Sequence, residues 1–145
     1  MKLTPYITVQ DTAKAIDFYC TALGARETGA RFTEPGGKIG HAEVSFGDYP
    51  LMLSDEYPDY DAVSPATLSG STALLHLYVD DVDAVVARAQ SLGAAVLRPA
   101  ADQDYGDRAA TIRDPFGHRW MISTAGAAVD KATLQERVGD TYRID

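Results

Sequence analysis

The sequence contains a single cysteine, and other features that would define a class of protein are missing as well. Cys20 has no partner within the 145 residues, which excludes a small fold stabilised by internal disulfides. No run approaches the roughly 18 consecutive apolar residues that a membrane-spanning helix needs. Residues 1–5 lack the apolar segment of a signal peptide, so we expect a cytoplasmic protein without a membrane partner.

Positive charge is also scarce. Lys and Arg number 13 against 21 Asp and Glu, which gives a formal net charge of −8, and no basic run is present. Such a surface repels a phosphate backbone, so nucleic acid is not expected as a partner. Gly-x-Ser-x-Gly, Walker-type and Gly-x-Gly-x-x-Gly motifs are absent. What is present is apolar material: hydrophobic residues make up 46% of the chain, enough for an ordinary globular core.

The chain contains an internal repeat. Residues 6–11 align with residues 76–81, and each segment ends in an Asp placed to cap the start of a helix. Gly24 and Gly93 then follow at positions suited to a helix end. Between cap and glycine, apolar residues at spacings of three and four predict one buried helix face in each copy. These faces consist of Ala15, Ile16, Tyr19 and Leu23 in the first copy, and Val82, Val85, Val86 and Ala89 in the second.

Strands are predicted after each helix. They are expected at about 25–33, 38–46 and 50–54, and again at about 94–98, 108–113 and 118–123. This pattern predicts an α+β protein with one pseudo-symmetric domain, residues 1–125. It consists of module one (1–55), a linker (56–71) and module two (72–125). Residues 126–145 are expected to form a tail with one short helix over 131–138.

Three segments carry a resemblance to a known family: Ala15-Ile16-Asp17-Phe18-Tyr19, Leu77-Tyr78-Val79-Asp80-Asp81, and Asp114-Pro115-Phe116-Gly117-His118. With the tandem βαβββ pattern, they resemble the vicinal-oxygen-chelate (VOC) superfamily of glyoxalases, bleomycin resistance proteins and dioxygenases. Gly40-His41-Ala42-Glu43, Tyr105-Gly106-Asp107-Arg108 and Arg119-Trp120 are similar to its PhnB-like branch. The resemblance implies two βαβββ modules whose curved sheets form a cup, a small-molecule ligand and a homodimer. The fold alone does not decide the chemistry.

The resemblance also implies where a metal would bind. Metal-using relatives take one ligand from the first and one from the last strand of each module, and the matching positions here are Thr4, Leu53, Leu74 and Met121. None of these is a ligand for zinc, nickel or iron, so we expect no metal and no cofactor. The alternative is a divalent metal held by a set shifted by two residues, which brings in Asp55, His76 and Arg119.

Three residues are candidates for catalysis: His41, Glu43 and His76. His41 and Glu43 are two residues apart and therefore share one sheet face, and His76 lies on the first strand of the second module. If these side chains converge, they can bind a metal, act as acid and base, or hydrogen-bond a ligand. The other interpretation is that His41 and Glu43 only form a hydrogen bond with each other at the sheet surface.

Side-chain alternation predicts the lining of the cup. Arg119 can hold a carboxylate or phosphate with its planar guanidinium, or form a surface ion pair instead. Tyr57, Tyr60 and Tyr105 are expected in loops at the mouth. The expected ligand contacts are Tyr6, Thr8, His41, Glu43, Leu53, Asp55, His76, Tyr78, Tyr105, Arg108, Arg119 and Met121.

Three functions are compatible with these residues. The first is a metal-free protein that binds or sequesters a small metabolite or an antibiotic, as in antibiotic resistance. The second is a lyase or isomerase of the glyoxalase type, either metal-dependent or using His/Glu acid–base chemistry. The third is a structural or regulatory dimer whose cavity is vestigial.

Overall fold

Two four-stranded sheets form the molecule, which is described here from a computed structural model covering residues 1–145. The first sheet has the strand order β1-β4-β3-β2 and the second the order β5-β8-β7-β6. In both, the first strand pairs in parallel with the last, and the other pairs are antiparallel. The predicted α+β fold with two tandem βαβββ modules is confirmed.

The first module contains β1 (Tyr6–Thr8), α1 (Thr12–Leu23), β2 (Arg26–Thr33), β3 (Ile39–Phe46) and β4 (Tyr49–Ser54). Helix α1 begins where Asp11 accepts a hydrogen bond from the Lys14 backbone N–H, and it ends at Gly24 in the left-handed conformation. The predicted face of α1 is buried as expected, together with Thr12, Phe18 and Ala22.

The second module repeats this plan with β5 (Leu75–Tyr78), α3 (Val82–Ser91), β6 (Ala95–Asp102), β7 (Arg108–Arg113) and β8 (Arg119–Thr124). Asp81 caps α3 by accepting from the Ala84 N–H, and the predicted valine face is buried. The linker holds a 3₁₀ turn, η1 (Pro58–Tyr60), and the short helix α2 (Pro65–Leu68). The predicted tail helix is confirmed as α4 (Lys131–Val138).

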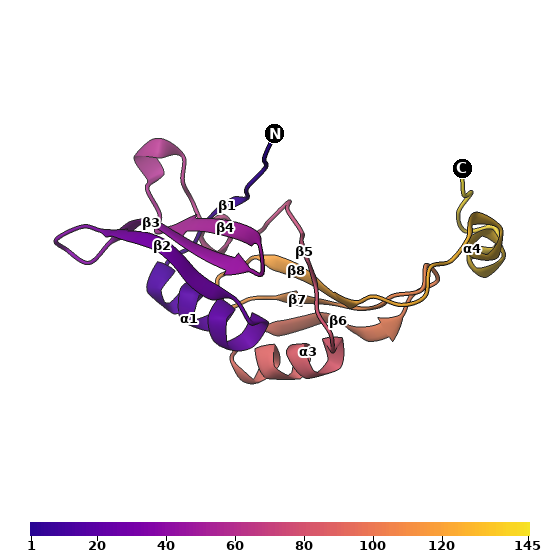
Figure 1. Cartoon of the computed structure of the whole chain (residues 1–145). Helices are drawn as coiled ribbons and strands as arrows, with labels where there is room; N and C mark the ends of the chain where they lie inside the picture. The colour runs from indigo at the N-terminus through magenta and orange to yellow at the C-terminus, as the bar shows by residue number, and fades with distance from the viewer.

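Both helices cover one side of the sheets and leave the opposite side open. Figure 1 shows α1 and α3 next to each other beneath the two sheets, with α4 set apart from this body at the end of the β6–β7–β8 ribbon. A core of 23 residues lies between the helices and the sheets. We call the uncovered side the open face. The two sheets do not close over it within one chain, so a single chain forms an open cup.

Alternation on β4 differs from the prediction by one residue. Leu53 was expected to face the cup, but it is buried in the core with Leu51, and the two residues pair with Ala42 and Val44. Met52 takes the open-face position instead, opposite Glu43 on β3. The expectation that Leu53 contacts a ligand is therefore wrong, because this side chain packs beneath the sheet.

A buried carboxylate joins the two modules. Asp114, in the β7–β8 turn, is 3% exposed and accepts a hydrogen bond from the Tyr19 hydroxyl of α1 at 2.8 Å. The same carboxylate accepts from Trp120 Nε1 and from the backbone N–H groups of Phe116 and His118. His118 is buried, and its Nε2 lies 2.9 Å from the Thr8 carbonyl oxygen. These contacts fix module one against module two.

Candidate ligand-binding site

A chain of three polar side chains lies on the open face of the first sheet. The Tyr6 hydroxyl is 3.0 Å from His41 Nδ1, and His41 Nε2 is 3.2 Å from Glu43 Oε1. A carboxylate can only accept, so Nε2 of a neutral His41 carries the proton, and His41 Nδ1 and the Gly40 carbonyl oxygen are the two acceptors within reach of the Tyr6 hydroxyl proton. The side chains of His41 and Glu43 are 25% and 29% exposed, and Tyr6 is half exposed. All three members of this chain of hydrogen bonds are therefore partly accessible to solvent.

The strands and their neighbours explain why these groups meet. Tyr6 pairs with Met52, and Met52 with Glu43, so all three side chains share one face. Phe32 lies edge-on to the His41 ring, with 5.6 Å between centroids, and is itself largely exposed. An aromatic side chain therefore stands beside the imidazole, where it can contact a flat ligand.

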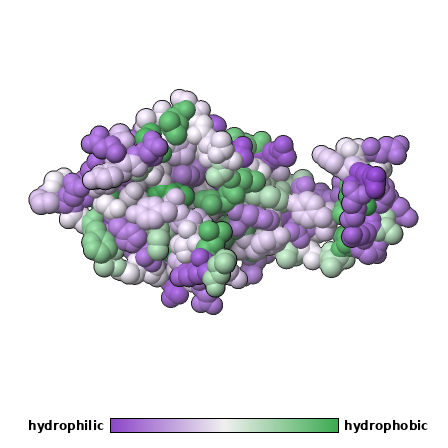
Figure 2. Space-filling view, turned by 90° about the horizontal axis from the view of Figure 1, so that it is seen from above, coloured by the Kyte–Doolittle hydropathy of each residue, from purple (hydrophilic) through white to green (hydrophobic).

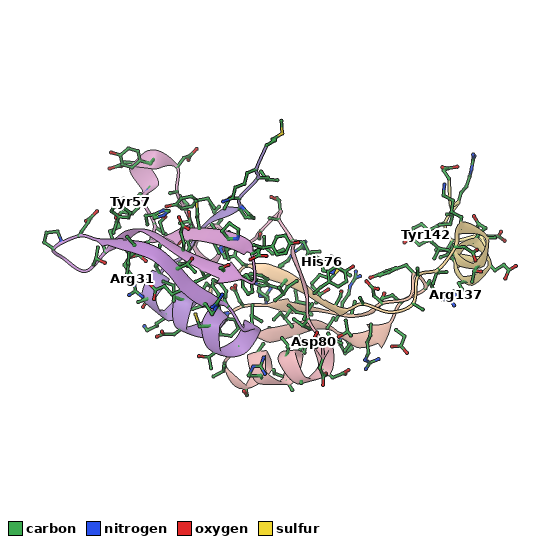
Figure 3. All side chains as sticks on the ribbon, viewed as in Figure 1. Arg31, Tyr57, His76, Asp80, Arg137 and Tyr142 are labelled. Atoms are coloured by element: carbon green, nitrogen blue, oxygen red, sulfur yellow. The ribbon has the colours of Figure 1, made fainter.

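Tyr57 lies beside this cluster, on the linker. Its hydroxyl donates to Glu34 at 2.7 Å, and this hydrogen bond raises the pKa of Tyr57 to about 12. Lys38 Nζ lies 3.8 Å from the centroid of the Tyr57 ring. Figure 3 shows Tyr57 next to the first sheet, whereas His76 lies on β5 of the second.

A second polar cluster lies on the open face of the second sheet. His76 Nε2 is 2.8 Å from Ser123 Oγ, and its ring lies 4.5 Å from the ring of Tyr78. The Tyr78 hydroxyl donates to Asp107 at 2.8 Å, which raises the pKa of Tyr78. Ser123 is fully buried, so its hydroxyl orients the imidazole rather than meeting a ligand.

The two clusters are separate within one chain. Convergence of His41, Glu43 and His76 was one possibility from the sequence, but no group of three or more His, Cys, Asp or Glu side chains is placed to hold a metal ion. On the first and last strands of the modules, where the family takes its metal ligands, the open-face residues include Met52, His76 and Met121. Two thioethers and one imidazole do not match the oxygen and nitrogen donors that zinc, nickel or iron sites use. The residues present do not fit the family's metal.

Two hollows lie next to these clusters, one beside His76 and Tyr78 and the other beside Tyr6. An apolar groove of about 780 Å³ runs along β5 and contains His76, Tyr78 and the exposed Tyr49. A second hollow of about 680 Å³ contains Tyr6, Thr8 and Arg119. Figure 2 shows hydrophobic surface gathered in the middle of the face opposite α1 and α3, with more polar surface around it. An apolar surface with a few polar groups is typical of small-molecule sites.

Two predicted site residues have structural partners instead. Asp55 accepts from the Thr12 N–H at 2.7 Å and from the Ile39 N–H at 2.6 Å, so both carboxylate oxygens hold backbone at the start of α1 and β3. Arg108 lies on the helix side of β7 and pairs with Asp83 of α3 and with Asp102. The structure therefore contradicts the expectation that Asp55 and Arg108 line the cup.

The remaining predicted residues lie on or near the open face. Thr8, Tyr78, Arg119 and Met121 are on the expected side of their strands. Tyr105 is in the β6–β7 turn, near the tail, where burial raises its pKa. Sequence reasoning missed Met52 and Ser123, which come to this face only once the register of β4 and β8 is known.

Comparisons with known proteins agree with this architecture. The family model described as "Glyoxalase/Bleomycin resistance protein/Dioxygenase superfamily" matches residues 3–122. The uncharacterized protein Rv0887c of Mycobacterium tuberculosis is 38% identical over 136 residues, covering 92% of this chain and 79% of the relative.

Two solved structures share the fold. TnmS3, an antibiotic binding protein from Streptomyces, is 28% identical with a TM-score of 0.62, covering 85% of this chain and 93% of TnmS3. A PhnB protein from Bacillus cereus is 20% identical with a TM-score of 0.64, and the match covers 86% of this chain and 100% of the PhnB protein. At that identity the second likeness concerns the fold alone.

Proposed function

This chain belongs to the glyoxalase/bleomycin resistance protein/dioxygenase superfamily, as its motifs predicted, and from that premise we propose that it binds a small organic molecule on the open face without a resident metal. The observation that carries this proposal is the apolar groove beside His76 and Tyr78, together with the Tyr6–His41–Glu43 cluster, whose Tyr6 borders a second hollow. Such groups suit a flat or aromatic ligand with hydrogen-bonding substituents. The likeness to TnmS3 supports an antibiotic or a metabolite of that kind.

We propose that the working form is a homodimer. Each chain leaves large hydrophobic side chains uncovered on its open face, among them Phe32 at 64% and Tyr78 at 56% exposure. A second copy that placed its own open face over the first would turn two open cups into enclosed sites. Light scattering at micromolar concentration tests this directly: a mass of one chain, 15.6 kDa, contradicts it.

The experiment for ligand binding is a thermal-shift panel. It contains bleomycin as a cationic glycopeptide, a series of flat aromatics, and Zn²⁺, Ni²⁺ and Mn²⁺. A ligand at 100 times its Kd stabilises the native state by about 2.7 kcal/mol, which raises Tm by roughly 5–10 °C for a chain of this size.

Variants then locate the site. His76→Ala should abolish most of the shift, while Tyr142→Phe, on the tail and 67% exposed, should leave it intact. Stabilisation by the metals, with stoichiometric metal in the purified protein, overturns the metal-free proposal. An unchanged ligand response in His76→Ala removes that residue from the site.

A specific observation also favours a second candidate, an acid–base enzyme. In the Tyr6–His41–Glu43 chain, Glu43 fixes the imidazole tautomer, and His41 can take the Tyr6 proton as Tyr6 takes one from a substrate. The test is turnover of the hemithioacetal of methylglyoxal and glutathione in chelator-treated protein. Turnover by the metal-free protein that is lost in the His41→Gln variant favours this candidate. Activity restored only by added Ni²⁺ or Zn²⁺ refutes it.

A further inference from the structure

A polar hollow outside the two clusters contains two arginines. It has a volume of about 490 Å³ and lies between the β7–β8 turn and the end of α2. Only one of its ten lining residues is hydrophobic. Its lining includes Ser69, Ser71, Arg113, Asp114, Gly117 and Arg119.

The two arginines are direct neighbours across the sheet. Arg113 on β7 is the register partner of Arg119 on β8, so their side chains leave the same face side by side. Like charges in this position repel each other. Neither residue forms an ion pair with any carboxylate of the chain, although acids outnumber bases by 21 to 13. The pair is therefore a local concentration of positive charge on an acidic protein.

Arg119 also has an unsatisfied donor. Its Nε is buried and has no hydrogen-bond partner. Buried donors without partners are rare in proteins because the group has lost its water and gained nothing in return. The Arg119 guanidinium is thus left without a full set of hydrogen-bond partners within the chain.

Asp114 is the one carboxylate in the hollow, and its oxygens are already occupied. Oδ2 accepts from Tyr19 and Trp120, and Oδ1 accepts from the N–H groups of Phe116 and His118. Its charge reduces the net positive charge of the site from two to one. It does not supply the missing partner for Arg119, because it forms no ion pair with either arginine.

The opposite wall of the hollow is held in place by close packing. A Cβ added at Gly117 would lie 3.0 Å from both the Ala66 N and the Pro65 Cβ, so α2 rests directly on the β7–β8 turn. Ser69 then takes the left-handed conformation with φ 58°, and Gly70 N–H bonds back to the Pro65 carbonyl. Ser69 is thus held in the wall of the hollow that also contains the two arginines.

We propose that this hollow binds the carboxylate or phosphate group of a small organic anion, with the group held between Arg113 and Arg119. A guanidinium presents two parallel N–H donors that match both oxyanions. The adjoining 680 Å³ hollow also includes Arg119 and is bordered by Tyr6, Leu68 and Leu75, which gives the body of such a ligand an apolar surface. The inference rests on its own contacts and stands whether or not the His41 or His76 clusters bind a ligand.

Inorganic phosphate and benzoate are the probes, titrated by calorimetry at constant ionic strength with sodium chloride as the reference anion. Arg113→Gln and Arg119→Gln should each weaken the affinity for phosphate about tenfold or more, as expected for losing a hydrogen bond between charged groups. Arg98→Gln is the matched control: it removes the same charge from β6 of the same sheet, at an exposed position outside the hollow. His41→Gln should leave phosphate binding unchanged, which separates this site from the proposed function.

Melting temperatures give a second measurement. Arg113→Gln should not lower the Tm of the ligand-free protein, because it relieves repulsion, yet it should remove the Tm rise on adding phosphate. If benzoate binds and phosphate does not, the natural ligand carries a carboxylate. If phosphate binds and benzoate does not, the natural ligand carries a phosphate. The proposal is overturned if neither probe binds better than chloride, or if Arg98→Gln weakens binding as much as Arg119→Gln does.

Discussion

Replacing Tyr19 with Phe removes one hydroxyl from the buried contact between the modules and keeps the ring. Tyr19 is fully buried, and its ring packs against Phe18, Phe116 and Trp120, contacts that Phe retains. The lost hydrogen bond to Asp114 is one to a charged group, worth about 1.5–3 kcal/mol. Tm should therefore fall by roughly 3–12 °C.

The assay is urea unfolding followed by circular dichroism, with Asp114→Asn and the double variant completing a cycle. The coupling free energy between the two positions should be about 0.5–3 kcal/mol. A Tyr19→Phe variant within about 0.5 kcal/mol of wild type, the range typical of neutral surface changes, refutes the view that this bond joins the modules.

The Tyr19→Phe substitution should also change how the stability of the protein depends on pH in alkaline solution. Burial and the neighbouring Asp114 raise the pKa of Tyr19 well above its ordinary value. The unfolded chain therefore loses this proton first, and the stabilisation, complete below about pH 10, is lost as pH rises above it. Stability of Tyr19→Phe should decline less steeply there. An identical slope in both proteins contradicts the assignment.

Three further predictions follow from contacts described above. Leu53→Ala should cost about 2–5 kcal/mol as a core truncation, whereas Met52→Ala, on the open face, should cost far less; equal losses in urea melts contradict the face assignment of β4. Asp11→Ala should cost about 1 kcal/mol at pH 7 as a lost helix cap. The difference should shrink below about pH 4, because the Lys14 N–H lowers the pKa of Asp11, so its contribution is lost as the carboxylate is protonated. A constant difference down to pH 2 argues against capping. Gly126→Ala should free the tail to proteolysis without moving Tm, since its Cβ would overlap the Gly106 carbonyl oxygen; unchanged cleavage shows that the tail is held elsewhere.

Local patterns predicted most of the fold because their physics is local. Asp11 and Asp81 cap helices through hydrogen bonds that span three residues, and Gly24 ends a helix through its own backbone angle. The buried helix faces follow from periodicity alone. The tail helix 131–138 was also predicted with its observed bounds.

The site was harder to predict because its residues depend on register. Leu51-Met52-Leu53 is apolar throughout, so alternation cannot tell which side faces the core, and the choice made from the sequence was wrong. The position of Arg108 was also hard to predict, because its partner Asp83 lies on α3, distant in sequence, and only the packed structure shows their contact. Whether His41 and His76 meet depends on the placement of whole sheets, which no local pattern encodes.

The parallel pairing of β1 with β4 has a consequence for how the chain is made. A ribosome delivers β1 first, yet its hydrogen-bonding partner emerges only after α1, β2 and β3 have been completed. The hairpins β2–β3 and β3–β4 close from neighbouring segments, whereas β1 must wait and join an existing edge. Until then Tyr6, Ile7 and Thr8 offer unpaired backbone to other chains, so the nascent protein is most open to aggregation before its fourth strand appears.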